Sequence, residues 1–151
     1  MLNGMPRPLP DLDTQPFWDA CREQRFLIPK CADCGYARWP PGPMCPQCQS
    51  TETDWIESEG RGQVYSWVVV THPVDPILAD QVPYVVGLID LAEGARVVAN
   101  VDGCEPDEVV AGMDVQLYFG DPGPDGIPIP NFRVADKVRE VSRWNSGLRQ
   151  R

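Results

Sequence analysis

Four cysteines in two close pairs constrain this chain more than any other feature of its sequence. They follow the pattern Cys-x2-Cys, ten residues, Cys-x2-Cys, at positions Cys31, Cys34, Cys45 and Cys48. Two pairs at this separation are typical of a metal site in which each pair forms a tight knuckle that presents two thiolates. Gly35 follows the first pair and can adopt the left-handed backbone that such a knuckle commonly needs. The pattern therefore predicts a small ribbon stapled by a metal ion.

The ligand set indicates a structural metal rather than a catalytic one. Four thiolates fill a tetrahedral zinc ion and leave no open position for water or substrate. Iron bound as in rubredoxin uses the same ligands, and the ligands alone do not exclude it. We favour one zinc ion because nothing else in the sequence suggests electron transfer. Two disulfides or four free thiols are the alternative, but matched pairs at ribbon spacing rarely arise by accident.

The rest of the chain has the composition of a β-rich protein. Its 151 residues include 17 prolines and 13 glycines, which predict many turns and few long helices. Strand candidates separated by turn signals follow the last cysteine, and their number is typical of a barrel or a sandwich. They span residues 55–57, 62–71, 84–91, 96–101 and 115–119, with a return at 131–134. The side chains predicted to be buried are Val64, Trp67, Val69, Val86, Leu88, Val98 and Leu117.

A short helix is predicted before the first cysteine pair, over residues 13–23. Asp13 or Thr14 can cap its free N–H groups, and Phe17 and Cys21 fall four residues apart on one face. A helix of this length is not stable alone. Its apolar face must therefore dock either on the chain's own core and ribbon or on another subunit.

Few residues of the chain are suited to catalysis. There is a single histidine, His72, at the end of a predicted strand, and two cysteines, Cys21 and Cys104, lie outside the metal pattern. Buried free cysteines usually behave as small hydrophobic residues. We find no Ser-His-Asp order, no glycine-rich phosphate loop and no open metal position. These features argue against an enzyme that acts by itself.

No stretch of the chain approaches the roughly 18 to 20 apolar residues that span a bilayer. Residues 1–10 also lack the apolar region of a signal peptide. We therefore expect a cytoplasmic protein that does not contact a membrane.

Several further motifs occur in an order that points to a known family. They are Arg7-Pro8-Leu9-Pro10 with Pro16-Phe17-Trp18, the four cysteines with Trp39-Pro40-Pro41, residues 60–67, residues 82–86, and residues 101–104 through 112–115. In this order they resemble the DUF35 family, in which a rubredoxin-like zinc ribbon precedes an OB-fold. The resemblance implies a mainly β protein with a short N-terminal helix, a zinc ribbon and a five-stranded OB-fold barrel. The corresponding segments are 1–25 for the N-terminal segment and helix, 26–54 for the ribbon, 55–136 for the OB-fold and 137–151 for a basic tail.

The resemblance also implies a function. DUF35 proteins are accessory subunits of thiolase-superfamily complexes, either thiolases or thiolase-like retro-aldolases, in steroid side-chain or aromatic-compound catabolism. The expected partner is a thiolase-fold subunit in a hetero-oligomer, and the expected substrate of the complex is a CoA thioester. We expect the interface to involve Phe17, Trp18 and Trp39, because aromatic anchors dominate interface energetics. The acyl group and the choice between thiolytic and retro-aldol cleavage stay open.

Binding of single-stranded nucleic acid is the alternative function, since zinc ribbons and OB-folds commonly serve it. It requires a surplus of basic residues, whereas the formal net charge of this chain is -9. In residues 60–136 only Arg61, Arg96 and Arg133 oppose a dozen acidic residues. The five basic residues of the tail could instead meet an acidic partner. The charge distribution disfavours nucleic-acid binding by the barrel.

Overall fold

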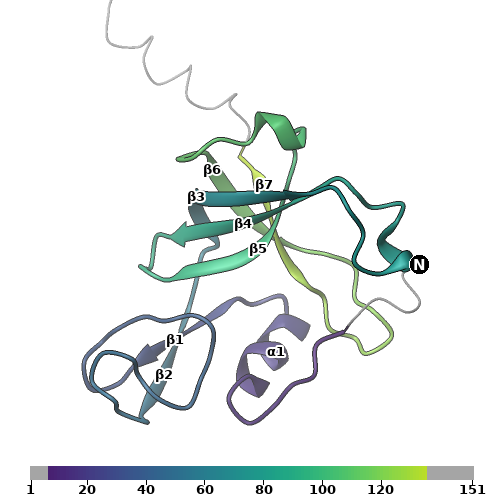
Figure 1. The fold of residues 1–151 in the computed structure, drawn as a ribbon. Helices are drawn as coiled ribbons and strands as arrows, with labels where there is room; N and C mark the ends of the chain where they lie inside the picture. Colours follow the sequence, from purple (N-terminus) through teal and green to yellow (C-terminus); the bar gives the residue numbers. More distant parts are fainter. Residues whose placement is uncertain (1–6, 136–151) are drawn as a thin grey trace, which may run out of the picture.

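The computed structural model describes residues 7–135 and has the predicted architecture, which is mainly β with one short helix (Figure 1). The basic tail, residues 137–151, lies outside the described residues. Within residues 7–135, no helix is long and apolar enough to cross a membrane. The helix and strands, in chain order, are α1 (Gln15–Arg22), β1 (Leu27–Cys31), β2 (Thr53–Glu57), β3 (Arg61–Val70), β4 (Tyr84–Leu91), β5 (Arg96–Asp102), β6 (Asp114–Phe119) and β7 (Pro130–Val134). Two short 3-10 turns are η1 (Pro76–Leu78) and η2 (Pro106–Glu108).

The ribbon is built on the antiparallel pair β1 and β2, in which Pro29 lies opposite Trp55. A single bridge between Lys30 and Ala37 adds the next segment of chain to the other side of β1. Cys31 ends β1, so the first cysteine pair begins where the strand stops. The connection from β1 to β2 carries the second cysteine pair and brings it next to the first.

The remaining strands form a closed barrel in the order β3-β4-β5-β7-β6. All neighbours are antiparallel except β5 and β7. Closure leaves no free sheet edge, and this removes the usual site of unwanted strand pairing. Gly94 has a φ of +93° in the turn between β4 and β5, a left-handed backbone that glycine adopts without a steric penalty. The barrel confirms the predicted fold class.

The predicted barrel interior is only partly correct. Val64 is buried, and Trp67 and Leu117 pack partly buried against the core. Val86 and Leu88, however, point outward, because Val85, Ile89 and Leu91 fill the inner side of β4. Val98 is likewise on the outside of β5 and Val69 is exposed. Moving the predicted pattern along a strand by one residue exchanges its inner and outer sides. Because β4 is apolar on both sides, the alternation of its residues could not identify the side that faces the core.

A group of aromatic side chains joins the helix, the ribbon and the barrel. Phe17 of α1 lies 5.4 Å from Phe26 and 4.8 Å from Trp39, measured between ring centroids. Phe26 in turn lies 6.3 Å from Phe132 in β7. These rings belong to one continuous buried cluster that extends into the barrel. Figure 1 accordingly shows α1 and the β1–β2 pair together at one end of the barrel.

The helix begins later than predicted and is capped differently. Thr14 is the N-cap residue, but its side chain makes no capping hydrogen bond to the helix. The carboxylate of Asp11 instead accepts hydrogen bonds from the backbone N–H groups of Asp13 and Thr14. This local turn, rather than Asp13, sets the start of α1.

Candidate functional site

The structure brings the four cysteines of the two pairs together. Their sulfur atoms all lie within 4.8 Å of one another. The Sγ atoms of Cys31 and Cys48 are 3.5 Å apart, and those of Cys34 and Cys45 are 3.7 Å apart. Four sulfurs placed about 2.3 Å from a tetrahedral ion would be about 3.8 Å apart. The donor set and its spacing therefore fit one tetrahedral metal ion.

The two knuckles have the same backbone geometry. In each, the first cysteine's N–H donates to the carbonyl five residues later, and its carbonyl accepts from the N–H four residues later. The residue at that fourth position has positive φ, +76° at Gly35 and +63° at Gln49. The backbone N–H of Cys34 donates to the Cys31 sulfur and is the main reason that the pKa of this thiol is lowered to about 6. Such N–H groups stabilise the thiolate that a metal requires.

The cysteines of the structure are free thiols. None of its six cysteines, all of which lie within residues 7–135, forms a disulfide bond. The closest sulfur pair in the ribbon is 3.5 Å apart, whereas a disulfide bond is about 2.0 Å long.

The residues considered for catalysis are not assembled into a site. Cys21 is fully buried, and burial raises the pKa of its thiol to about 12, so it is protonated at neutral pH. His72 is exposed in the connection between β3 and β4. Cys104 is half-buried just beyond β5. The three stand on different segments, which are α1, the β3–β4 connection and the turn after β5.

The three aromatic residues expected at an interface differ in accessibility. Phe17 is only 2% exposed, so it is a core residue. Trp18 and Trp39 are half-buried. The rings of Trp18 and Trp39 each lie 4.8 Å from the ring of Phe17, so both tryptophans pack against this buried side chain. Of the three, only the two tryptophans offer surface to another molecule.

Arg38 is a buried residue of the ribbon that sequence reasoning missed. It is 6% exposed, and its Nη2 atom donates to the carbonyl of Gly42 and to the hydroxyl of Thr53. It therefore ties the loop between the cysteine pairs to β2. Its Nε and Nη1 atoms have no hydrogen-bond partner among the described residues. The position of Arg38 between the two cysteine pairs was the one sequence feature that indicated a structural role in the ribbon.

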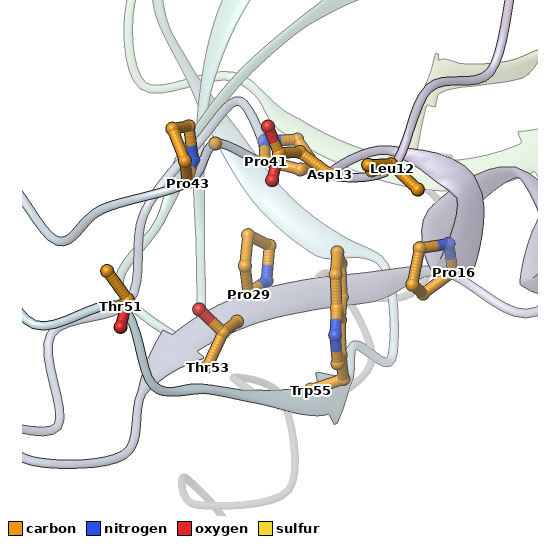
Figure 2. Close-up of a pocket in the computed structure, with 10 residues that line it drawn as sticks. Leu12, Asp13, Pro16, Pro29, Pro41, Pro43, Thr51, Thr53 and Trp55 are labelled. Carbon is orange, nitrogen blue, oxygen red and sulfur yellow. The ribbon is translucent and has the colours of Figure 1, made fainter.

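A cavity of about 170 Å³ opens between the ribbon and the start of α1, and the two hydrogen-bond partners of Arg38, Gly42 and Thr53, help to line it. Figure 2 shows Trp55 and Pro16 flanking one end of it, with Thr51 and Thr53 toward the other. Prolines form much of the remaining wall. The cavity is too small for a typical small-molecule site, which measures about 300 Å³ or more.

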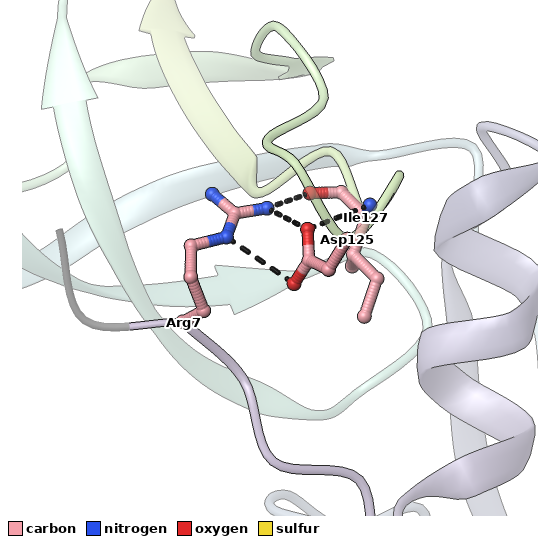
Figure 3. A network of polar contacts seen from close by, with 3 residues as sticks. All are labelled: Arg7, Asp125 and Ile127. Carbon is pink, nitrogen blue, oxygen red and sulfur yellow. Dashed lines mark hydrogen bonds and ion pairs between the residues drawn. The ribbon is translucent and has the colours of Figure 1, made fainter. Parts of the chain in front are cut away.

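A larger cavity, of about 480 Å³, lies at one end of the barrel. It is bordered by the β3–β4 connection, β5 and the loop between β6 and β7. Arg7 helps to line it and is clamped to that last loop. The Arg7 guanidinium donates to both carboxylate oxygens of Asp125, at 2.6 and 3.2 Å, and to the carbonyl of Ile127 (Figure 3). The clamp ties the start of the described chain to the wall of the cavity.

We expect the Asp125→Asn variant to release residues 7–14 from this loop. The hydrogen bond from Arg7 is the main cause that holds the pKa of Asp125 below its ordinary value of about 3.9. The clamp should therefore stabilise the fold fully at pH values above about 3.9, the pKa of an aspartate in the unfolded chain. This stabilisation should disappear as the pH falls through the lower pKa that Asp125 has in the folded protein. The measurements are amide hydrogen exchange of residues 9–14 at pH 7, and the melting-temperature difference between variant and parent as a function of pH.

The Asp121→Asn variant is the matched control, because Asp121 is an exposed acid in the same loop. It should leave exchange in residues 9–14 unchanged. Equal exchange in the parent and both variants would show that the clamp does not hold this segment.

The barrel offers no cationic groove to a nucleic acid. Arg61 pairs with Glu59, Arg96 with Asp90, and Arg133 with Asp102. Arg96 and Arg133 also stack over the rings of Tyr65 and Tyr118. These are the three arginines of residues 60–135, and each has an acidic partner, so none is left to neutralise phosphate.

Comparisons with known proteins agree with the geometry. Residues 18–54 match the family described as the rubredoxin-like zinc ribbon domain of ChsH2, and residues 55–120 match its C-terminal OB-fold domain. A DUF35 domain-containing scaffold protein of Methanocaldococcus jannaschii is 36% identical over 115 residues, which are 73% of this chain and 81% of that protein. The chain belongs to the DUF35 family.

Two further relatives of this DUF35 chain carry enzyme names. A "probable enoyl-CoA hydratase alpha subunit" of Thermomonospora curvata is 42% identical over 130 residues, which are 86% of this chain. The chain spans only 40% of the length of that relative. The solved structure of an "Ltp2-ChsH2(DUF35) aldolase" is 42% identical, with a TM-score of 0.76, and the match covers 86% of this chain and 100% of that one.

Proposed function

We propose that this DUF35 protein is a non-catalytic subunit of a complex in which a thiolase-fold partner cleaves or forms carbon–carbon bonds in acyl-CoA substrates. The observation that carries the proposal is the likeness, over 86% of this chain, to a chain of the "Ltp2-ChsH2(DUF35) aldolase". A second relative is named as a subunit of an acyl-CoA enzyme, which supports the same substrate class. The proposed location is the cytoplasm. Steroid side chains and aromatic compounds are the proposed sources of the acyl group.

One zinc ion is proposed as the resident metal, with Cys31, Cys34, Cys45 and Cys48 as its ligands. The sulfur spacing supports a tetrahedral ion, and two knuckles of the same geometry support a pre-formed site. With four thiolates bound, such an ion has no free position, so its role is to hold the ribbon together. We take residues 26–54 as the ribbon domain and 55–136 as the OB-fold domain of the subunit.

The chemistry is assigned to the partner. Breaking a carbon–carbon bond in an acyl-CoA requires a positioned nucleophile or base. In this chain the buried thiol of Cys21 is protonated, His72 is exposed in the β3–β4 connection, and Cys104 is half-buried after β5. The catalytic residues therefore belong to the thiolase-fold subunit.

The proposed contact with the partner includes Trp18 and Trp39. Both are half-buried on the side of the molecule where α1 meets the ribbon, and both rest on the buried ring of Phe17. Rigid aromatic side chains with one face exposed are the usual anchors of interfaces. Phe17 contributes by positioning them and not by direct contact.

The proposal is tested by purifying the tagged protein from its source organism and identifying the chain that accompanies it in stoichiometric amount. A thiolase-fold protein is the expected result. With that protein as the ligand, Trp18→Ala should weaken binding roughly 30-fold, while Trp18→Phe should bind nearly as well as the parent. Circular dichroism of the isolated variants separates weak binding from poor folding. If the parent instead purified alone and bound single-stranded oligonucleotides in a salt-dependent manner, the proposal would be wrong.

A further inference from the structure

The ribbon contains two cations that have no acidic partner in the described chain. Within residues 7–135, every lysine and arginine forms an ion pair except Lys30 and Arg38. The paired residues are Arg7, Arg22, Arg25, Arg61, Arg96 and Arg133. Carboxylates are abundant in this chain, whose formal net charge is -9, so a shortage of acids is not the reason. Both unpaired cations accompany the metal ligands, Lys30 directly before Cys31 and Arg38 between the two cysteine pairs.

Arg38 is the more demanding of the two, because its guanidinium is buried. Its Nη2 atom donates to the carbonyl of Gly42 at 3.2 Å and to the hydroxyl of Thr53 at 2.6 Å, and neither acceptor carries a charge. Its Nε and Nη1 atoms are buried without a partner among the described residues. A buried cation needs an opposite charge nearby to offset the loss of its hydration. That charge has to come from a group other than a carboxylate of the described chain.

Strand pairing places the side chain of Arg38 on the same side of the ribbon as that of Cys31. The backbone N–H of Arg38 donates to the carbonyl of Pro29, so Arg38 lies beside Pro29 at one edge of β1. At the other edge, Thr53 lies opposite Cys31. Residues two apart in a strand share a side, and so do residues directly opposite each other. The side chains of Arg38, Cys31 and Thr53 therefore share one side of the ribbon.

The hydrogen bond to Thr53 brings the guanidinium close to the sulfur cluster. The Cβ atoms of directly opposite residues, such as Thr53 and Cys31, lie about 5 Å apart. With Nη2 of Arg38 at 2.6 Å from the Thr53 hydroxyl, the guanidinium lies within roughly 10 Å of the Cys31 sulfur. Charges at this separation interact appreciably in a buried region, because little water screens them.

Lys30 approaches the first knuckle from its backbone side. Its Cε atom would lie 3.7 Å from a Cβ atom at Gly35, so the aliphatic part of the lysine packs beside the turn of this knuckle. Asp54 lies opposite Lys30 in the β1–β2 pair, but the two side chains form no ion pair. Lys30 is half-buried, so water screens its charge more than that of Arg38.

The occupied metal site supplies the missing negative charge. Four thiolates and one divalent zinc ion leave a net charge of about -2 on the site. We propose that Arg38, assisted by Lys30, balances this charge and thereby strengthens zinc binding. The inference rests on the proposed zinc ion and goes beyond its four ligands, because it assigns a role to the two unpaired cations. Residues that support metal ligands from outside the ligand set commonly change metal affinity 10- to 100-fold.

The first test is the Kd of the full chain for Zn²⁺, measured by competition with a chromophoric chelator. Arg38→Gln removes the buried charge and should weaken zinc binding roughly 30-fold. Arg38→Lys keeps the charge and should bind zinc nearly as well as the parent. Arg25→Gln is the matched control, because Arg25 precedes β1 and its charge is already paired with Glu57. It should bind zinc like the parent.

A second variant separates the charge of Arg38 from its hydrogen bonds. Thr53→Val removes the hydroxyl that accepts from Nη2 but leaves the guanidinium in place. Because the charge is retained, this variant should bind zinc far more tightly than Arg38→Gln. A zinc Kd as weak as that of Arg38→Gln would overturn the inference, since the hydrogen bond and not the charge would then be responsible.

The reduction potential of the iron-loaded protein is a readout that a purely structural role would not move in a fixed direction. With iron in place of zinc, the site carries a net charge of about -1 when oxidised and about -2 when reduced. A nearby cation favours the more negative, reduced form. Arg38→Gln and Lys30→Gln should therefore both lower the potential, while Arg25→Gln should leave it unchanged. Lys30 is half-buried, so its variant keeps the fold and decides the test if Arg38→Gln does not fold.

Two further results would contradict different parts of the account. Equal zinc Kd values for the parent and Arg38→Gln, or an unchanged potential in both neutral variants, would overturn the inference and leave the proposed zinc site intact. A parent chain that binds no zinc would contradict the proposed metal itself.

Discussion

Replacing Cys45 with serine is expected to abolish metal binding and unfold the ribbon. Cys45 is fully buried, and its sulfur lies 3.7 Å from that of Cys34 within the four-sulfur cluster. Zinc binding contributes about 10 to 16 kcal/mol to small zinc-dependent folds at pH 7, as much as the whole stability of a typical domain. The ribbon has little apolar core of its own to replace that contribution. The measurements are zinc content, expected to fall from about one ion per chain to none, and protease cleavage within residues 26–57.

The other two cysteines provide the controls. Cys104→Ser should keep the metal and the protease resistance of the parent. Cys21→Ser should also keep the metal, although it places a hydroxyl in the core and should lower the melting temperature. Removal of zinc by a chelator should reproduce the Cys45→Ser result. If chelation removed the ion without exposing residues 26–57 to protease, the structural role of the metal would be wrong.

The spacing of the four cysteines was the most informative part of the sequence, because few backbone arrangements can place four sulfurs around one metal ion. Two Cys-x2-Cys pairs must each form a turn that aims two sulfurs at one point, and the structure has two such turns with positive φ at Gly35 and Gln49. The barrel strands were also predictable, since turn residues mark their ends. The family resemblance then added the closed five-stranded order, which periodicity alone could not choose over a sandwich.

Other features depend on contacts between distant residues and could not be predicted. The inner side of β4 is decided by what packs against it, so Val86 and Leu88 were wrongly placed inside. Phe17 was expected at a subunit interface, but Phe26 and Trp39 cover it within the same chain. The clamp between Arg7 and Asp125 joins residues that are 118 positions apart. No local pattern contains such information.

The ion pairs of the barrel further disfavour nucleic-acid binding by this domain. Composition showed only that arginines are scarce in the barrel, whereas the structure shows that Arg61, Arg96 and Arg133 are each paired.

The central claim is that the chemistry resides on the partner, and turnover of an acyl-CoA thioester tests it most directly. Turnover is measured for the isolated chain, for the isolated thiolase-fold partner and for their mixture, with zinc content checked in each sample. The account predicts no turnover by the isolated chain, even with its zinc bound, and full activity in the mixture. Turnover by the isolated chain at the rate of the mixture would contradict the account, and His72 would then be the first residue to replace.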